Sequence, residues 1–165
     1  MRPFAKYLLF AAFAPVFCAC TQANYKQVRR GTAARTGVPT SGEVAALTRH
    51  TVAADREAVF DALLRLLQAE GCLIESADRA SGLIAARQML CDRDAFGRSM
   101  GQIRTLSFLV LPAGGRSEIR LTVYIGYQGY SGGDSGSYYI EEMGMATGPE
   151  FYGTWFAKID DALKQ

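Results

Sequence analysis

The chain has 165 residues, of which 49% are hydrophobic and 21% charged, and its formal net charge is +2. This hydrophobic content supports one folded domain and argues against a wholly disordered protein. Because 18 basic side chains stand against 16 acidic ones, the balance indicates no nucleic-acid-binding surface. One histidine and four cysteines offer little material for a metal site. The composition therefore favours neither a nucleic acid nor a metal as the ligand.

The N-terminus has the features of a secretory signal. Arg2 and Lys6 precede an apolar run over residues 7–19, which is shorter than the ~20 residues of a membrane-spanning helix. The end of this run resembles the lipobox of bacterial lipoproteins, since the small Ala19 directly precedes Cys20. The resemblance predicts a lipoprotein signal peptide at 1–19 and a mature protein that begins with Cys20.

The lipoprotein resemblance implies that Cys20 carries the lipid, with palmitate among its acyl chains. Several acyl chains hold a protein on a membrane more firmly than one chain does. In that family a residue other than aspartate after the cysteine, here Thr21, favours the periplasmic side of the outer membrane; the inner membrane is the alternative. Ordinary cleavage after Ala23, without lipidation, is the other possibility.

A tether is expected between the anchor and the domain. Residues 21–43 are rich in Thr, Gln, Arg, Gly and Ser and show no apolar period. We therefore predict a lipid-anchored flexible tether over residues 20–43, reaching ~25 Å by random-coil scaling. It is either a solvated linker or a segment that contacts anionic lipid head groups. Residues 44–165 are expected to form a single domain.

The periodicity of residues 44–165 predicts a helix near each end and strands between them. Asp55 is a suitable N-cap for the first helix and Gly71 a suitable end. Pro149 is placed to begin the last helix, after a glycine-rich stretch that is expected to be a loop over residues 126–148. The expected strands cover residues 44–52, 72–77, 83–90 and 103–111 and the alternating apolar residues of 119–125.

The element order β-α-β-β-β-β-α predicts an α+β domain, with an antiparallel sheet of about five strands and two helices packed on one face. Within it, a helix, Gly71, a strand, an Asp78-Arg79-x-x-Gly82 turn and a strand follow one another. This pattern, over residues 55–90, resembles the domains of BamC-like lipoproteins, which belong to the outer-membrane barrel-assembly machinery and have a helix-grip arrangement. The resemblance implies a protein-binding role.

Catalysis is not expected, although one motif resembles a catalytic segment. Residues 133–136 read Gly-Asp-Ser-Gly, which resembles the nucleophile segment of chymotrypsin-type serine proteases around Ser135. That family needs two β-barrels, for which one domain of this length is too small. His50 lacks the sequence context of the family's histidine and is expected to be a surface histidine on a strand. We expect no catalytic residue, no metal and no cofactor.

The glycine-rich stretch also contains several tyrosines. Tyrosine among small, adaptable neighbours is typical of recognition surfaces. Two interpretations stay open: a loop that binds a partner, or a mobile loop whose tyrosines partly cover the end of the sheet. The candidate partner-binding residues are Tyr127, Tyr130, Tyr138 and Tyr139.

Cys72 and Cys91 are candidates for a disulfide bond. If the turn between their strands is centred between Ser81 and Gly82, antiparallel pairing places Cys72 opposite Cys91. An exported protein meets an oxidising compartment, so a bond there is reasonable and would contribute ~3 kcal/mol in the chain-entropy model. A register slip of two residues would leave both thiols free.

These observations predict a non-enzymatic bacterial envelope lipoprotein. It would have a membrane attachment through its lipid and an envelope protein as partner, as an accessory of an outer-membrane assembly or transport complex. The alternative is a small binding module for an apolar or glycan ligand, held between helix and sheet or by the tyrosines. Phe151 and Trp155 would line such a cleft, but aromatic residues at this helical spacing are more typical of an ordinary core.

Overall fold

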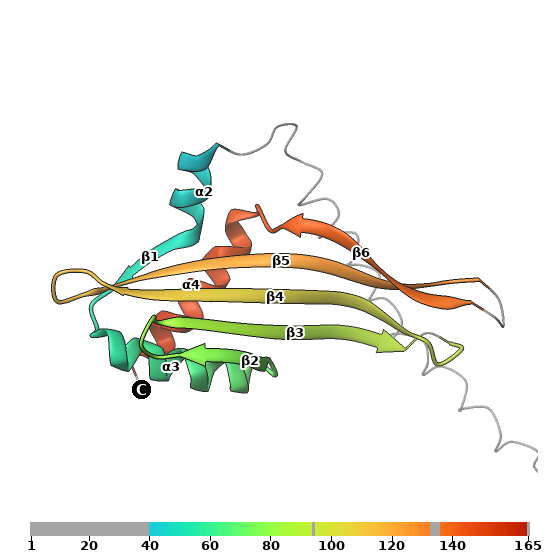
Figure 1. The fold of residues 1–165 in the computed structure, drawn as a ribbon, viewed down its shortest axis with the longest axis horizontal. Helices are drawn as coiled ribbons and strands as arrows, with labels where there is room; N and C mark the ends of the chain where they lie inside the picture. Colours follow the sequence, from blue (N-terminus) through green and yellow to red (C-terminus); the bar gives the residue numbers. More distant parts are fainter. Residues whose placement is uncertain (1–39, 94, 133–135, 165) are drawn as a thin grey trace, which may run out of the picture.

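The computed structural model describes residues 40–93, 95–132 and 136–164 (Figure 1). Cys20, Ser135 and most of the expected tether lie outside this part of the chain. The elements are α2 (Ser41–Thr48), β1 (Arg49–Val52), α3 (Arg56–Ala69), β2 (Leu73–Asp78), β3 (Leu83–Arg93), β4 (Ser99–Pro112), β5 (Ser117–Ser131), β6 (Ser137–Met145) and α4 (Pro149–Ala162).

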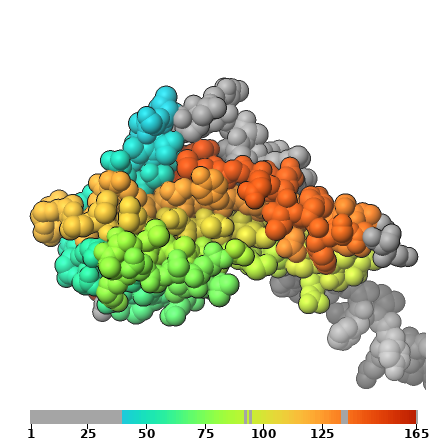
Figure 2. Space-filling view, in the orientation of Figure 1, coloured from blue at the N-terminus to red at the C-terminus, as the bar shows by residue number. Residues whose placement is uncertain are grey.

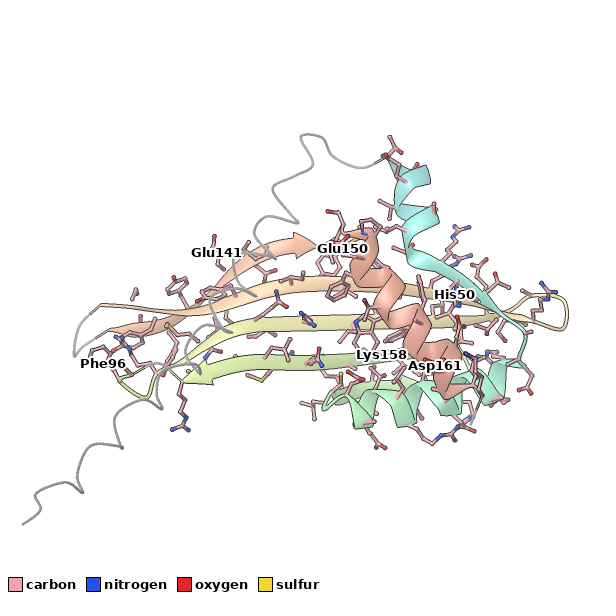
Figure 3. All side chains as sticks on the ribbon, turned by 180° about the vertical axis from the view of Figure 1, so that it is seen from behind. His50, Phe96, Glu141, Glu150, Lys158 and Asp161 are labelled. Atoms are coloured by element: carbon pink, nitrogen blue, oxygen red, sulfur yellow. The ribbon has the colours of Figure 1, made fainter. Side chains whose placement is uncertain are left out.

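The six strands form one antiparallel sheet, in which five follow the order β1-β5-β4-β3-β2 and the sixth, β6, also pairs with β5. β1 pairs with the start of β5 and β6 with its later part, so these two strands follow one another along the same edge of β5. α3 and α4 lie together on one face of the sheet (Figure 3). The predicted α+β fold with an antiparallel sheet is confirmed, with six strands and three helices in the described residues instead of about five and two.

The additional helix, α2, occupies part of the strand predicted over residues 44–52. Oγ1 of Thr40 accepts a hydrogen bond from the backbone N–H of Glu43 (3.3 Å), and Oε2 of Glu43 accepts one from the backbone N–H of Thr40 (2.8 Å). This reciprocal pair is a capping box, which stabilises a helix start. The strand prediction is wrong over residues 44–48 because the cap starts a helix there.

The core lies between the sheet and the helices α3 and α4. The predicted helix signals are confirmed: Asp55 caps α3 by accepting from the N–H of Ala58 (2.9 Å), and Pro149 begins α4. Trp155 and Ile159 of α4 are buried. The largest fully buried side chains are Tyr152, Phe108, Leu63, Leu67, Ile84, Leu106, Ile119, Leu121 and Ile159.

The Asp78-to-Gly82 turn, on which the BamC-like resemblance partly rests, has a structural role. Nη2 of Arg56 donates to the carbonyl oxygens of Arg79 (2.6 Å) and Ala80 (2.8 Å), so α3 holds the turn. Gly82 has φ +81° and its carbonyl accepts from the N–H of Val110 (2.9 Å). The motif therefore joins α3, the β2–β3 turn and β4.

The sheet extends well beyond its helices (Figure 1). We call the face that α3 and α4 cover the inner face, and the other the outer face. The last row of completely buried side chains on the inner face consists of Ala86, Leu106 and Val123. The strand segments past this row are called the arm; they are residues 88–93 of β3, 99–104 of β4, 125–131 of β5 and 137–144 of β6.

Candidate partner-binding surface

The glycine-rich stretch predicted as a loop forms the far half of β5 and all of β6. A Cβ built on Gly129 would lie 2.5 Å from Cζ of Tyr139, so the tyrosine ring occupies the space above that glycine. Covering of a strand glycine by an aromatic side chain from the neighbouring strand stabilises a sheet. The loop prediction is wrong because the side chains that cover these glycines come from the paired strand.

Apolar side chains cross the outer face of the arm, which is the face seen in Figure 2. Met89 lies opposite Ile103, and Ile103 lies opposite Gly126. On β6, Glu142 lies opposite Gly126, and Ile140 lies opposite Gln128. Cγ2 of Ile140 is 3.3 Å from the position that a Cβ on Gly126 would take, so the Ile140 side chain leans over Gly126 toward Ile103. Met89 is 58% exposed and Ile140 59%. Apolar side chains from β3, β4 and β6 therefore lie on the outer face, and those of Met89 and Ile140 face water.

The inner face of the arm also has exposed apolar and aromatic side chains. Leu90, Gln102, Tyr127 and Glu141 form one row across its four strands. Leu90 and, in the next row, Tyr139 are each 45% exposed. Figure 3 shows that Glu141 lies beyond α4, part of the way toward the end of the arm where Phe96 is labelled. A soluble β-sheet ordinarily buries one face, whereas the arm leaves apolar side chains exposed on both.

The four predicted tyrosines are thus divided between two faces. Tyr127 and Tyr139 lie on the inner face, while Tyr130 and Tyr138 lie opposite one another on the outer face with ring centroids 5.3 Å apart. The hydroxyl of Tyr138 accepts from the backbone N–H of Ser99 (3.2 Å). They do not form one cluster, because successive side chains of a strand point to opposite faces.

The turn between β3 and β4 adds an aromatic residue at the end of the arm. Phe96 is 81% exposed. The guanidinium of Arg98 lies 4.7 Å from the ring centroid of Phe96 and 4.9 Å from that of Tyr130, within the range of cation–π contacts. The sequence analysis did not identify Met89, Leu90 and Phe96 as surface residues. The available signal was that Met89 and Leu90 are adjacent apolar residues near the end of a strand, so one of them lies on each face of the sheet.

The two backbone edges of the arm, on β3 and on β6, have no strand beside them in the described residues, and the edge of β3 is the one next to the exposed side chains of the inner row. β2 pairs with β3 only up to Arg87, opposite Leu73, and β3 continues to Arg93 (Figure 1). Over residues 88–93 β3 is paired with β4 alone. Unpaired strand edges offer N–H and C=O groups for pairing with another chain. This edge therefore provides backbone hydrogen-bonding groups next to the exposed side chains.

Cys72 and Cys91 are both free thiols. Leu73 lies opposite Arg87, with a bulge between Ile74 and Ser76, so the register that would place Cys72 opposite Cys91 is wrong. Cys72 is buried, and this burial raises the pKa of its thiol. Cys91 instead lies opposite Gly101 of β4. The predicted disulfide bond is absent because the hairpin register separates the two residues.

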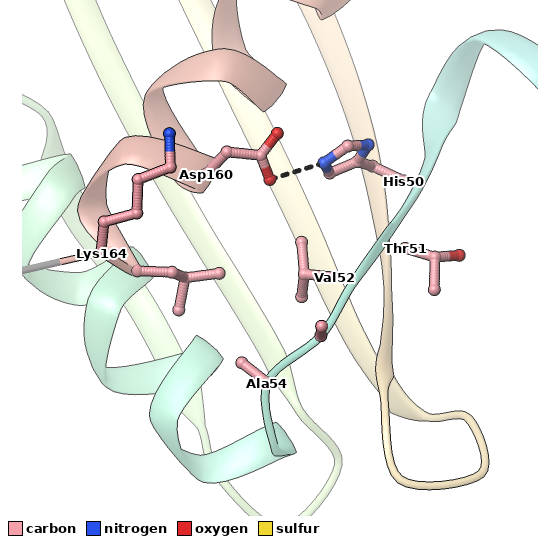
Figure 4. A pocket seen from close by; sticks show the side chains of 8 residues that line it. His50, Thr51, Val52, Ala54, Asp160 and Lys164 are labelled. Carbon is pink, nitrogen blue, oxygen red and sulfur yellow. Dashed lines mark hydrogen bonds and ion pairs between the residues drawn. The ribbon is translucent and has the colours of Figure 1, made fainter.

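His50 belongs to a pocket (Figure 4) at the end of the domain opposite the Phe96 turn of the arm (Figure 3). Its Nε2 lies 2.8 Å from Oδ1 of Asp160, and its ring stacks on Phe156 with centroids 4.8 Å apart. His50 lies on strand β1 as expected, and its side chain is 27% exposed, with its inner side packed against α4. The open pocket of about 410 Å³ is lined by His50, Thr51, Val52, Ala53, Ala54, Asp160, Leu163 and Lys164.

This pocket has few groups suited to chemistry. Nζ of Lys164 is paired with Asp161 at 2.8 Å, and the His50–Asp160 pair links β1 to α4.

Ser135, the candidate nucleophile of the Gly-Asp-Ser-Gly motif, lies outside the described residues. Within those residues no group of three His, Cys, Asp or Glu side chains is placed to hold a metal ion. The same part of the chain contains no helix long and apolar enough to cross a membrane.

Comparison with known proteins gives no relative: no family model matches the chain, and no curated protein matches it significantly. The function is therefore inferred from the arm and from the sequence.

Proposed function

We propose that this protein is a non-enzymatic lipoprotein of the bacterial envelope whose domain binds another envelope protein through the arm. Cys20 attaches it to the outer membrane, and the partner belongs to an assembly or transport complex there. The observation that supports this role is the exposure of apolar and aromatic side chains on both faces of the arm, with Met89, Ile140 and Phe96 each more than half exposed.

The composition of the arm fits a protein partner. Tyrosine, phenylalanine, methionine and arginine are enriched where proteins bind one another, and large exposed apolar patches mark interaction sites. The unpaired edge of β3 adds backbone groups that an extended partner segment can pair with. A partner that covers the arm removes its apolar surface from water, which is a favourable change in free energy.

The alternative of an apolar ligand between helices and sheet has less support. Trp155 is 4% exposed, and its ring packs edge-on against Phe108 with centroids 6.0 Å apart. Ile159 is likewise buried. These side chains fill the helix–sheet interface, so Trp155 acts as a core residue.

The proposal is tested by substituting exposed apolar residues on the outer face of the arm in the full-length protein. A Met89→Ser/Ile140→Ser variant removes two exposed apolar side chains of the arm. Leu73→Ser is the matched control, since Leu73 is 66% exposed but lies on β2, outside the arm. We expect one envelope protein to co-purify with the detergent-extracted wild type and the Leu73 variant and to be lost from the double variant.

Two results would contradict the proposal. Equal recovery of the same protein with the double variant would place the binding surface elsewhere. If the wild-type protein is recovered without any other protein, even after chemical cross-linking in intact cells, the proposal of a stable partner is contradicted. Mass spectrometry of the N-terminal peptide tests the anchor in the same cells: we expect acyl chains on Cys20 of the wild type and none on a Cys20→Ala variant, and an unmodified Cys20 in the wild type would contradict lipidation.

A further inference from the structure

Arg104 is a half-buried cation at the base of the arm. It lies opposite Gln88 and Ile125, in the first row beyond the completely buried core. The ring of Phe151, on the first turn of α4, lies over its guanidinium, with 4.9 Å between Cζ and the ring centroid. Arg104 therefore occupies the boundary between the helix-covered sheet and the uncovered inner face of the arm.

Two glutamines hold the guanidinium in a fixed orientation. Nε of Arg104 donates to Oε1 of Gln102 (2.5 Å), and Nη1 donates to Oε1 of Gln88 (3.4 Å). Gln88 is itself fixed, because its Nε2 donates to the carbonyl oxygen of Glu70 (3.0 Å). A guanidinium has five N–H donors, and Nη2 donates to no atom of the described residues. The group thus keeps donors for a further acceptor.

The charge of Arg104 is not balanced by a carboxylate of the described residues. The carboxylate of Glu70 is paired with Lys158 at 2.5 Å. Glu141 lies on β6, two strands away, and makes no ion pair with Arg104. Burial lowers the pKa of the Arg104 guanidinium, and the neighbouring Cys72 thiol opposes this shift in part. A partly desolvated charge without a partner is unfavourable, so a bound anion would gain from it.

The residues beside Arg104 suggest what carries the anion. Leu90 and Tyr127 lie in the next row of the inner face, on either side of Gln102, and give it an apolar and aromatic character. This row ends at the unpaired β3 edge, where Leu90 lies. An arginine fork matches the geometry of a carboxylate, and a flat apolar surface beside a strand edge fits an extended polypeptide.

We propose that the inner face of the arm receives an acidic segment of the partner protein, with a carboxylate of that segment bound by Arg104. This inference rests on the proposed function and specifies the chemistry of the partner. The two glutamines and Phe151 hold Arg104 in its binding orientation before the partner arrives, so little side-chain entropy is lost on binding.

The test is photo-cross-linking in cells, with p-benzoylphenylalanine in place of Leu90 in the full-length protein. Leu90 is 45% exposed on the inner face, in the row next to Arg104. We expect a cross-linked peptide of an envelope protein that contains Asp or Glu close to the cross-linked residue. In the same background, Arg104→Gln should reduce the cross-link yield at least about tenfold, as expected for loss of a central charged contact.

Arg87→Gln is the matched control. Arg87 lies on the same strand as Leu90 but on the outer face, where it pairs with Glu75 at 2.6 Å, and its exchange should change the yield less than about twofold. Arg104→Lys keeps the charge without the fork and should give an intermediate yield. It also keeps the test informative if the glutamine variant unfolds, which circular dichroism would show.

The outcomes separate this inference from the proposed function. Wild-type yield of the same partner in both Arg104 variants would overturn the carboxylate site and leave the protein-binding role intact. A cross-linked peptide without acidic residues, or a cross-linked phospholipid, would also overturn it. If neither Leu90 nor a second position, Met89, gives a cross-link to any protein, the proposed protein-binding function is itself contradicted.

Discussion

Gly82 and Gly129 illustrate two uses of a missing side chain in this sheet. Gly82 has φ +81°, and a Cβ there would lie 2.3 Å from the carbonyl oxygen of Val110. At Gly129 the space is filled by the far end of the Tyr139 side chain, which is able to move. Gly82 therefore fixes a turn against immovable backbone, whereas Gly129 makes room for a ring on the arm.

The first prediction concerns Gly82. Gly82→Ala combines a left-handed backbone conformation with a clash against β4, so we expect it to lower the free energy of unfolding by about 2–4 kcal/mol. Gly71→Ala is the control, because Gly71 has φ +70° but no atom within 4 Å of the added Cβ; a loss of about 1–2 kcal/mol is expected. Urea unfolding of both variants measures this. Equal losses would mean that the contact with Val110 has no energetic weight.

At the scale of elements, α4 covers the core on the inner face of the sheet, in the half that lies outside the arm. Its buried side chains Tyr152, Trp155 and Ile159 recur at helical spacing, and the hydroxyl of Tyr152 donates to the carbonyl oxygen of Ala146 (2.9 Å). α4 begins beside the arm, where Phe151 covers Arg104, and ends beside the pocket at His50. One helix therefore connects the core with both ends of the domain.

The second prediction tests whether Trp155 belongs to the core. Trp155→Ala should reduce the free energy of unfolding by about 3–5 kcal/mol, because a large buried ring is removed. Thr154→Ala, on the exposed side of the same helix, should change it by less than about 0.5 kcal/mol. Thermal unfolding of the two variants gives the comparison. A small effect at Trp155 would support a pocket between helix and sheet in place of a packed core.

At the scale of the whole molecule, the domain consists of a packed end and an exposed arm. Helices cover only the proximal half of the sheet, while β5 alone runs for 15 residues, or about 50 Å at the usual strand rise. The exposed half carries the apolar rows, the aromatic tip and the unpaired strand edge. Such an arm is suited to binding a partner away from the body of the domain.

The third prediction follows from the register of the whole sheet. Protein isolated from membranes without reductant and denatured in iodoacetamide should be alkylated on both Cys72 and Cys91, because the hairpin register keeps these thiols apart. Peptide mapping by mass spectrometry gives the result, with a reduced sample as control. A peptide pair bridged between the two cysteines would show that the register differs in the cell.

The candidate surface was only partly predictable. The sequence pointed to Tyr127, Tyr130, Tyr138 and Tyr139 because of their glycine and serine neighbours. It did not indicate Met89, Ile140 or Arg104, since a residue's exposure depends on where the helices end on the sheet. The partner of His50 was equally hidden, because Asp160 lies 110 residues further along the chain.

The sequence by itself determined the helices α3 and α4, their caps and the antiparallel α+β class, because these depend on short-range periodicity and local hydrogen bonds. Only the tertiary structure decided the register of β2 and β3, the division of the tyrosines between two faces and the extension of the sheet beyond its helices. Those features depend on contacts between strands that are distant in sequence. The bulge between Ile74 and Ser76 and the Tyr139 ring over Gly129 are two features that appear only in the paired strands.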